Sequence, residues 1–245
     1  MKIKIVLVFL LLFVGELQAQ KGVRFFFEVS GGVNSFAMER FNQYYVDSFA
    51  KINNIHDVKT TKGFNRSVVF HYFISSTFSI GTTFTYLYSK EKFENATIDF
   101  PYNESSNIIN SDIIIQNDAK IFGLSVAYYL PFFRKKTNFY TKHFSSSINA
   151  TFGYAYTKSL LNYSTVNRQL DFKARNIFAS FALGIDYKIT KKLFFSSIGI
   201  KIGYNQLESK VLKDKDNTDW IVLGYYPINL DFSGFYGSLV FKLGK

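Results

Sequence analysis

The chain has 245 residues, a formal net charge of +11 and no cysteine, and 47% of its residues are hydrophobic. A chain without cysteine excludes disulfide frameworks, thiol catalysis and thiolate zinc sites, and three prolines argue against a disordered protein. The 29 phenylalanines and 17 tyrosines exceed what an ordinary soluble core requires. The basic charge by itself allows nucleic acid or an anionic membrane surface as a partner.

The first residues have the layout of a secretory signal peptide. Lys2 and Lys4 precede ten consecutive apolar residues, Ile5 to Val14, and Ala19 stands where a signal peptidase cuts after a small residue. Ten residues are too few to span a bilayer as a helix. The sequence therefore predicts a signal peptide over 1–19 and an exported domain over 20–245, and export excludes nucleic acid as a partner.

From residue 22 onward, apolar and small or polar residues alternate with a period of two, which is the pattern of β-strands. The clearest case is 177–189, where Ile177 and Ile185 alternate with residues such as Gly184. The alternation predicts eight strands, over 22–35, 63–75, 78–88, 122–130, 144–156, 177–189, 194–205 and 229–243.

The composition of the two strand faces indicates which of them contacts lipid. In a soluble lipocalin-like barrel the apolar face points inward and the other face is rich in charges. Here the second face carries Gly, Ser, Ala, Thr and Asn, which suit the crowded interior of a narrow barrel. The strands also reach the ~9–11 residues that a bilayer-crossing strand needs. We therefore expect an all-β fold, an eight-stranded antiparallel up-and-down transmembrane β-barrel with its apolar face toward lipid.

The lengths of the connections predict the orientation of this barrel. The turns near 75–77 and 190–192 are short, whereas 36–62, 90–112 and 209–228 are long and polar, and 160–172 is intermediate. Outer-membrane barrels place short turns in the periplasm and long loops outside the cell. The 131–143 connection is longer than a usual periplasmic turn.

Tyrosines mark both ends of the predicted strands. In this orientation two interfacial rings form on the lipid face, as membrane barrels require. The outer ring contains Tyr86, Tyr88, Tyr154, Tyr156 and Tyr204, and the inner ring contains Tyr72, Tyr128 and Tyr187.

The leader, the eight amphipathic strands and the terminal Gly-Phe-Tyr-Gly-Ser-Leu-Val-Phe-Lys-Leu of residues 234–243 resemble the small outer-membrane β-barrel proteins of OmpA/OmpX type and the PorT-like family. The resemblance covers the whole mature chain. It implies residence in the outer membrane of a Gram-negative cell envelope, often without an assigned activity.

Motifs for catalysis are sparse. His56, His71 and His143 have no metal-binding spacing, and no phosphate-binding glycine loop is found, so we expect no metal and no cofactor. His143 and Ser145 have the His-x-Ser spacing of some outer-membrane deacylases. The predicted topology places them at the periplasmic end, whereas such chemistry faces the outer leaflet, so we expect no catalytic residues and no enzyme.

Strand parity places several ionisable groups in the lumen. The predicted cluster consists of Arg24, Glu28, Asp186, Lys188 and Lys201, with His71 and Lys242 beside it. Glu28 and Lys201 fall near mid-barrel and the others mostly near the periplasmic mouth, so we expect Glu28 and Lys201 to form an ion pair. The cluster fits either an ion path or a paired plug, and the narrow barrel favours the plug.

The expected partners are outer-membrane lipid and lipopolysaccharide, together with envelope proteins that contact the long loops. Cations predicted just above the outer ring are Lys90, Lys92, Lys173 and Arg175, and those on the inner side are Arg134, Lys135, Lys136, Lys142, Lys191 and Lys192. Anionic headgroups attract cations at such positions. Ordinary snorkelling lysines explain them equally well.

Three classes of function remain open at this stage. The sequence favours a structural or surface-interaction barrel with a lumen closed by packed side chains. The alternative is a narrow channel or transporter for small or hydrophobic solutes, and the least favoured is a lipid-modifying or proteolytic barrel enzyme.

Overall fold

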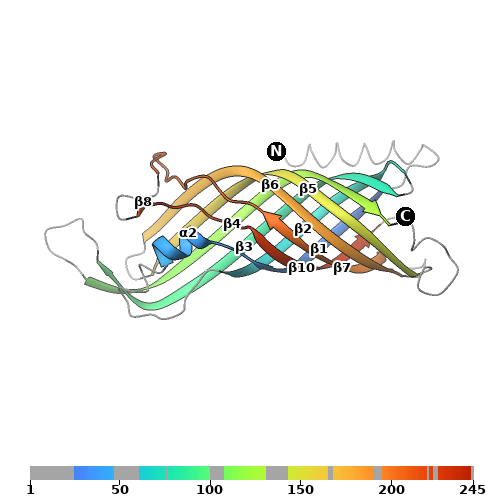
Figure 1. Ribbon diagram of the computed structural model, residues 1–245. Helices are drawn as coiled ribbons and strands as arrows, with labels where there is room; N and C mark the ends of the chain where they lie inside the picture. Colours follow the sequence, from blue (N-terminus) through green and yellow to red (C-terminus); the bar gives the residue numbers. More distant parts are fainter. Residues whose placement is uncertain are drawn as a thin grey trace, which may run out of the picture.

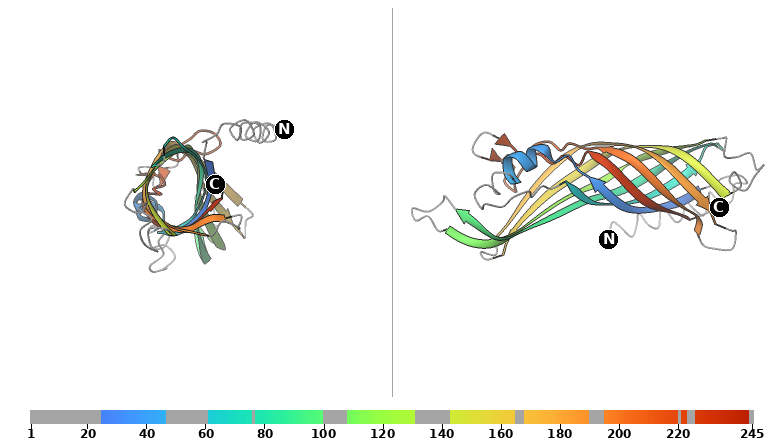
Figure 2. Two further views of the ribbon diagram at one scale, coloured as in Figure 1. Left: turned by 90° about the vertical axis from the view of Figure 1, so that its right-hand side faces the viewer. Right: turned by 60° about the horizontal axis from the view of Figure 1, so that its bottom comes forward.

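The computed structural model describes residues 25–46, 61–75, 77–99, 108–130, 143–164, 168–189, 195–219, 221–222 and 226–243. The expected signal peptide, 1–19, lies outside these residues. Eight antiparallel strands form a closed barrel in the order β1-β10-β7-β6-β5-β4-β3-β2, and the view along its axis shows the ring (Figure 2). The strands are β1 (Phe25–Ser35), β2 (Lys62–Phe73), β3 (Phe78–Asp99), β4 (Ile108–Tyr129), β5 (Phe144–Tyr163), β6 (Arg168–Lys188), β7 (Phe195–Gln206) and β10 (Gly234–Leu243).

The strand count and the up-and-down topology agree with the sequence prediction. Each barrel strand pairs with the strands that precede and follow it in the chain, and β1 closes the ring against β10. We call the end that contains Phe25, the β2–β3 turn and Leu243 the turn end, and the opposite end the loop end. At the turn end, the backbone N–H of Ile74 donates to Phe78 (3.0 Å) and closes the short connection between β2 and β3.

Strands β3 to β6 continue beyond the other four at the loop end (Figure 1). The last pair between β2 and β3 is Phe64 with Tyr88, whereas β3 pairs with β4 as far as Asp99 and β5 pairs with β6 as far as Tyr163. We call this four-stranded part the extension; it comprises residues 89–99, 108–117, 159–163 and 168–172. The prediction of loops over 90–112 and 160–172 was therefore wrong for the residues that are strand.

The sequence does not predict the extension as strand, because its apolar residues face inward whereas those of the membrane-spanning barrel face outward. Within the membrane the apolar residues face outward, but in the extension Ile113 and Ile115 are buried on the inner face while Lys92 on the outer face is exposed. A strand in water needs polar residues outward and apolar residues against a core. The charges that indicated a loop are those of a solvated sheet face.

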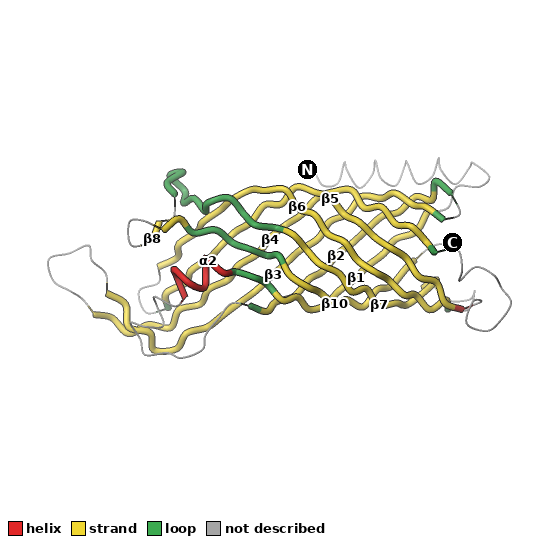
Figure 3. The backbone as a smooth tube through the Cα atoms, viewed as in Figure 1, coloured by secondary structure: helices red, strands yellow, loops and turns green. Residues whose placement is uncertain are grey.

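Two chain segments fold over the inner face of the extension and form a cap. The cap consists of the described residues of 36–46, with α2 (Glu39–Phe41) and the π-helical turn η1 (Asn42–Val46), and those of 207–233, with β8 (Ile221–Val222) and β9 (Tyr226–Pro227). Backbone hydrogen bonds join the segments, from Ala37 to Ser233 (2.8 Å) and from Phe232 to Leu207 (2.8 Å). These loops, drawn beside the strands in Figure 3, were expected to be polar and external. Phe36, Met38, Phe41, Leu207, Leu212, Ile228, Leu230 and Phe232 are instead buried, whereas 215–219 are exposed as expected. The final strand starts at Gly234 rather than at 229, because Asn229 to Ser233 belong to the cap.

The cap and the strands enclose an apolar core in the loop-end half of the molecule. Phe36 packs edge-to-face on Phe232, with ring centroids 5.1 Å apart. The core consists of Phe36, Met38, Phe41, Val46, Leu87, Phe93, Ile113, Ile115, Ala119, Ile121, Ala155, Leu161, Phe172, Ala174, Phe178, Leu207, Leu212, Ile228, Leu230 and Phe232. Burial of this many apolar side chains stabilises the cap against the strands. We call the cap and the extension together the head.

Candidate functional site

Four buried charged side chains meet inside the barrel and form a chain of ion pairs. Lys201 of β7 contacts Glu28 of β1 directly, and Lys242 of β10 lies 3.8 Å from the second Glu28 oxygen. The same Lys242 ammonium donates to Asp186 of β6 at 2.6 Å. Two anions and two cations alternate, so each buried charge has a partner of opposite sign, as a low-dielectric interior requires. We call these four residues the lumen charge chain.

The structure places the residues of the predicted lumen cluster differently. It brings Glu28, Lys201 and Asp186 together, and all three are buried. Lys188, the last residue of β6, is exposed at the turn end, opposite Ser197. Arg24 lies outside the described residues. Lys242, predicted to lie beside the cluster, joins its two parts, because the β1–β10 register places it opposite Glu28.

A glycine makes room for the Asp186 carboxylate. Gly199 of β7 lies opposite Asp186 of β6 with its α-carbon facing the lumen. A Cβ at this position would collide with Oδ1 of Asp186 and with the Ile185 carbonyl. The glycine therefore permits the close approach of β6 and β7 that positions Asp186 next to Lys242.

Aromatic rings fill the lumen on the turn-end side of the charge chain. The Lys242 ammonium lies 5.4 Å from the centre of the Phe26 ring and 5.3 Å from that of Tyr129, within the range of cation–π attraction. Phe26 stacks on His71 at 4.7 Å. His71 Nδ1 hydrogen-bonds to the Ser79 hydroxyl at 3.1 Å. Its Nε2 is buried with no hydrogen-bond partner among the described residues.

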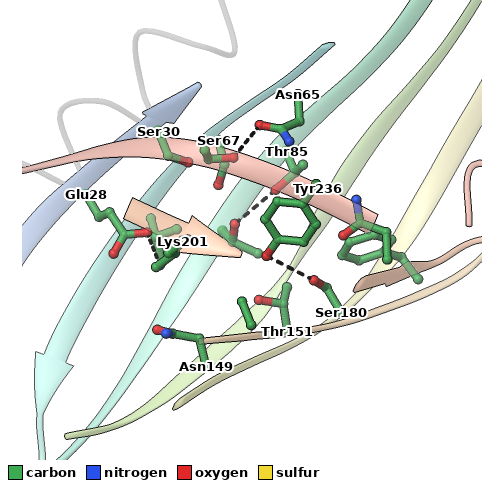
Figure 4. Close-up of a pocket in the computed structure, with 16 residues that line it drawn as sticks. Glu28, Ser30, Asn65, Ser67, Thr85, Asn149, Thr151, Ser180, Lys201 and Tyr236 are labelled. Atoms are coloured by element: carbon green, nitrogen blue, oxygen red, sulfur yellow. Dashed lines mark hydrogen bonds and ion pairs between the residues drawn. The ribbon is translucent and has the colours of Figure 1, made fainter. Parts of the chain in front are cut away.

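A small polar chamber lies on the loop-end side of the Glu28–Lys201 pair (Figure 4). Its volume is about 50 Å³, enough for about three to five water molecules at ~10–15 Å³ each. Tyr236 points toward Ser180 across it, with their hydroxyls 3.4 Å apart. Its wall includes the hydroxyl and amide side chains of Ser30, Asn65, Ser67, Thr83, Thr85, Asn149, Thr151, Asn205 and Ser238. Phe178, which belongs to the loop-end core, also lines the chamber.

The outer face of the extension carries a series of ion pairs. Lys92 lies 2.9 Å from Glu94 and 3.1 Å from Asp112, and these hydrogen bonds, with that to Glu94 the larger cause, raise the pKa of Lys92. Asp171 lies 3.2 Å from both Lys158 and Lys173. The exposed pair of Lys92 with Glu94 adds little to stability. Charged side chains along this face indicate that it lies in water.

The predicted cations have different environments. Lys90 and Arg175 are exposed on the outer faces of β3 and β6, while Lys92 and Lys173 have the carboxylate partners described above. The predicted inner cations, Arg134, Lys135, Lys136, Lys142, Lys191 and Lys192, lie outside the described residues, as does His56.

The described residues give little indication of catalytic or metal chemistry. His143 stacks on Tyr187 at the turn end with ring centroids 5.8 Å apart, and Ser145 pairs with Asp186 in the β5–β6 register. No group of three or more potential metal-ligating residues occurs among the described residues. In the same part of the chain, none of the helices has the length and apolar character needed to cross a membrane.

A belt of exposed apolar side chains surrounds the barrel. Every barrel strand contributes to it, for example through Phe27, Val68, Phe84, Leu124, Phe152, Leu183, Ile200 and Leu239. The tyrosines of both predicted rings lie on this outer face, exposed or half-buried. A soluble monomer rarely exposes an apolar patch of more than a few hundred Å², whereas a closed barrel with such a belt satisfies every backbone group within lipid.

The closed ring and the belt define the class: an eight-stranded integral β-barrel protein of the bacterial outer membrane. No family model and no curated protein sequence matches the chain. The likeness to the PorT-like family therefore remains a prediction.

Solved structures similar to this chain are outer-membrane and surface proteins. Neisserial surface protein A shares 11% identity, with 92% of this chain and 100% of that chain covered and a TM-score of 0.43. The outer membrane protease OmpT of Escherichia coli shares 10% identity, with 91% and 95% covered and a TM-score of 0.41. The attachment invasion locus protein Ail of Yersinia pestis, in complex with the heparin analogue sucrose octasulfate, shares 10% identity, with 92% and 99% covered and a TM-score of 0.39. The class assignment rests on this chain's own strand topology and belt.

Proposed function

We propose that the lumen of this outer-membrane barrel is closed by its own side chains and that the head presents a binding surface outside the cell. The head carries the proposal, because its outer face is charged and its inner face is packed on the cap. A polar sheet face of this kind cannot lie in lipid. The loop end therefore faces water, and outer-membrane barrels turn their longer loops outward.

Two barriers in series support a closed lumen. The lumen charge chain and the Phe26 and Tyr129 rings occupy its turn-end half, and the loop-end core occupies the other half. The polar chamber between them is small. An eight-stranded barrel is just wide enough to be filled by side chains, so we propose a plug rather than a channel.

The edge of the extension offers a specific means of interaction. Among the described residues, 89–92 of β3 pair with β4 on one side and with no barrel strand on the other. An unpaired strand edge presents N–H and C=O groups to which an extended segment of a partner can add as a further strand. We propose binding through this edge and the adjacent outer face, with no catalytic role for His143 or Ser145.

Site-specific photo-crosslinking on intact cells tests the proposal. A photoreactive amino acid at Lys90, exposed next to the free edge, is expected to yield a protein adduct. The matched control is Leu124, exposed on the lipid-facing belt of β4, which is expected to yield none. Equal adducts from both positions would contradict a binding surface on the head.

Planar-bilayer recording of the purified protein tests the closed lumen. We expect no steady, discrete conductance from the wild type. Such a conductance would contradict a closed lumen and favour the channel alternative. It would not affect the cross-linking test, which examines the binding surface of the head.

A further inference from the structure

A groove opens on the outer face of the molecule where the cap meets β5 and β6. Its volume is about 810 Å³, within the range of small-molecule sites. One wall is formed by side chains of β5 and β6, and the other is formed by Lys210, Val211, Lys213, Asp214 and Asn217 of the cap. The residues that matter for its chemistry are Tyr154, Tyr156, Lys173, Arg175, Lys210 and Lys213.

Hydrogen bonds hold the two walls of the groove together. Lys173 and Lys213 exchange a pair of backbone bonds, 2.7 and 2.9 Å long, and the Asn176 amide donates to the Glu208 carbonyl. The carboxylate of Asp214 accepts from the backbone N–H groups of Asp216 and Thr218, both at 2.9 Å. Both bonds end on Oδ1 of Asp214, and they fix this carboxylate in its own turn.

The groove gathers cations, and two of them have no anionic partner among the described residues. Lys173 pairs with Asp171 at 3.2 Å and Lys213 with Asp219 at 3.4 Å. No ion pair is formed by Arg175 or Lys210 within the part of the chain that the structure describes, and both are exposed. Both line the same groove. A guanidinium and an ammonium that face one cavity suit phosphate, to which the arginine can donate two parallel hydrogen bonds.

The position of the groove indicates that its occupant is amphiphilic. Ile177, 72% exposed, and Tyr154, 54% exposed, lie at its base and belong to the lipid-facing belt. Tyr154 and Tyr156 belong to the tyrosine ring at the loop end, so the groove lies at the level where lipid headgroups meet water. An amphiphilic ligand at this level of the membrane can contact the apolar belt with its acyl chains and the cations of the groove with its headgroup.

We propose that this groove binds the phosphate of a phosphorylated glycolipid headgroup from the outer leaflet of the membrane. Arg175 and Lys210 contact the phosphate, Lys173 and Lys213 add to the positive field, and Tyr154 and Ile177 contact the acyl chains. The proposal rests on the proposed orientation, with the loop end outside the cell, and names a lipid partner for the head.

Binding of purified lipopolysaccharide to the intact protein in detergent micelles tests the inference. The double variant Arg175→Gln/Lys210→Gln is expected to weaken binding by about tenfold or more, because charge-assisted hydrogen bonds to phosphate are among the strongest that side chains make. The control, Lys215→Gln, removes an exposed cation from the same turn that does not line the groove and is expected to bind as the wild type does.

Two further probes identify the source of the phosphate. Dephosphorylated lipopolysaccharide is expected to bind the wild type as weakly as the intact lipid binds the double variant, and inorganic phosphate at millimolar concentration is expected not to compete. Equal binding of the dephosphorylated lipid, or unchanged binding by the double variant, would overturn the site. Competition by phosphate alone would overturn the lipid as its ligand. None of these results bears on cross-linking at Lys90, which lies on β3, so failure here is distinguishable from failure of the proposed binding surface.

Discussion

At the scale of single residues, the position of Glu28 shows how strongly this barrel depends on paired charges. Glu28 is 2% exposed and has an ammonium group near each carboxylate oxygen. Its removal leaves Lys201 without its anion and Lys242 with Asp186 alone. Buried charges that lose a partner are strongly destabilising, whereas replacing a whole pair by apolar residues is often neutral.

We predict that Glu28→Ala lowers the free energy of unfolding by ~3–5 kcal/mol. The double variant Glu28→Gln/Lys201→Met is expected to cost less, because no cation is then left without its anion. Urea-induced unfolding in lipid vesicles measures both. A cost for Glu28→Ala below about 1 kcal/mol would show that water hydrates the pair.

Glu91 provides a pH-dependent prediction in the extension. Its side chain is half-buried without a hydrogen-bonded partner among the described residues, and burial raises the pKa of this carboxyl. An acid with a raised folded-state pKa binds its proton more readily when folded, so stability falls as pH rises from the unfolded pKa through the folded one. We predict that the amide protection factors of the extension, which are the intrinsic exchange rates divided by the observed rates at the same pH, are higher at pH 4.5 than at pH 7.

Glu91→Gln is expected to slow exchange at pH 7 and to remove this part of the pH dependence. The control is Glu94→Gln, since Glu94 is exposed and its pair with Lys92 adds little stability. An unchanged pH profile in Glu91→Gln would contradict the assignment to this carboxyl.

Part of the lumen was predictable from the sequence and part was not. Strand parity is a local property, so it placed Glu28, Lys201 and Asp186 inside. The contact between Lys242 and Glu28 depends on the register between the first and last strands. That register is set by closure of the ring, which leaves no short-range signal in the sequence.

At the scale of elements, the extension and the cap also could not be predicted from local sequence patterns. The alternation in 78–88 predicts β3, but the strand continues to Asp99. In this continuation the polar side chains face outward, which in the sequence resembles a polar loop. In the cap, Ile228, Leu230 and Phe232 keep the parity of the inward residues of β10, although they lie before that strand begins. Periodicity shows that a segment is extended, but it does not show whether lipid, water or a core lies on each side.

The cap leads to a prediction about a single buried ring. Phe232 is fully buried against Phe36, and truncation of a core phenylalanine costs ~3–5 kcal/mol. We predict that Phe232→Ala destabilises the cap and speeds proteolysis within 207–219, as limited digestion followed by mass spectrometry measures. Phe235→Ala, at a lipid-facing position three residues later, is the control and should leave the digestion rate unchanged. Equal rates for both variants would mean that the cap does not depend on this contact.

At the scale of the whole molecule, orientation is the property to test first. Lys215 is exposed in the cap turn and Lys188 is exposed at the turn end. We predict that a lysine-specific protease added to intact cells cuts after Lys215 and spares Lys188, because the outer membrane separates the two ends. Lysed cells are the control, since both ends are then accessible. Cleavage at Lys188 in intact cells would show that the turn end faces outward, which contradicts the proposed orientation.

A second prediction at this scale concerns the closed ring. The protein should fractionate with outer membranes and migrate differently on gels with and without boiling, because a closed barrel leaves no strand edge within the membrane for detergent to open. Recovery in the soluble periplasm would contradict the membrane assignment and favour the lipocalin-like barrel.

The lumen charge chain also has a consequence for how the barrel is assembled. Glu28 lies on the first strand, while Lys201 and Lys242 lie on the last two barrel strands. Until β1 meets β10, the carboxylate and the two ammonium groups are held apart by almost the whole length of the chain. Lys242 already has Asp186 of β6 as a partner, but Glu28 and Lys201 pair only when the seam closes. An incomplete barrel in the bilayer would therefore hold uncompensated charge at Glu28 and Lys201. Such a ring is expected to insert as a nearly complete unit, because only the closed barrel gives Glu28 and Lys201 each other as partners.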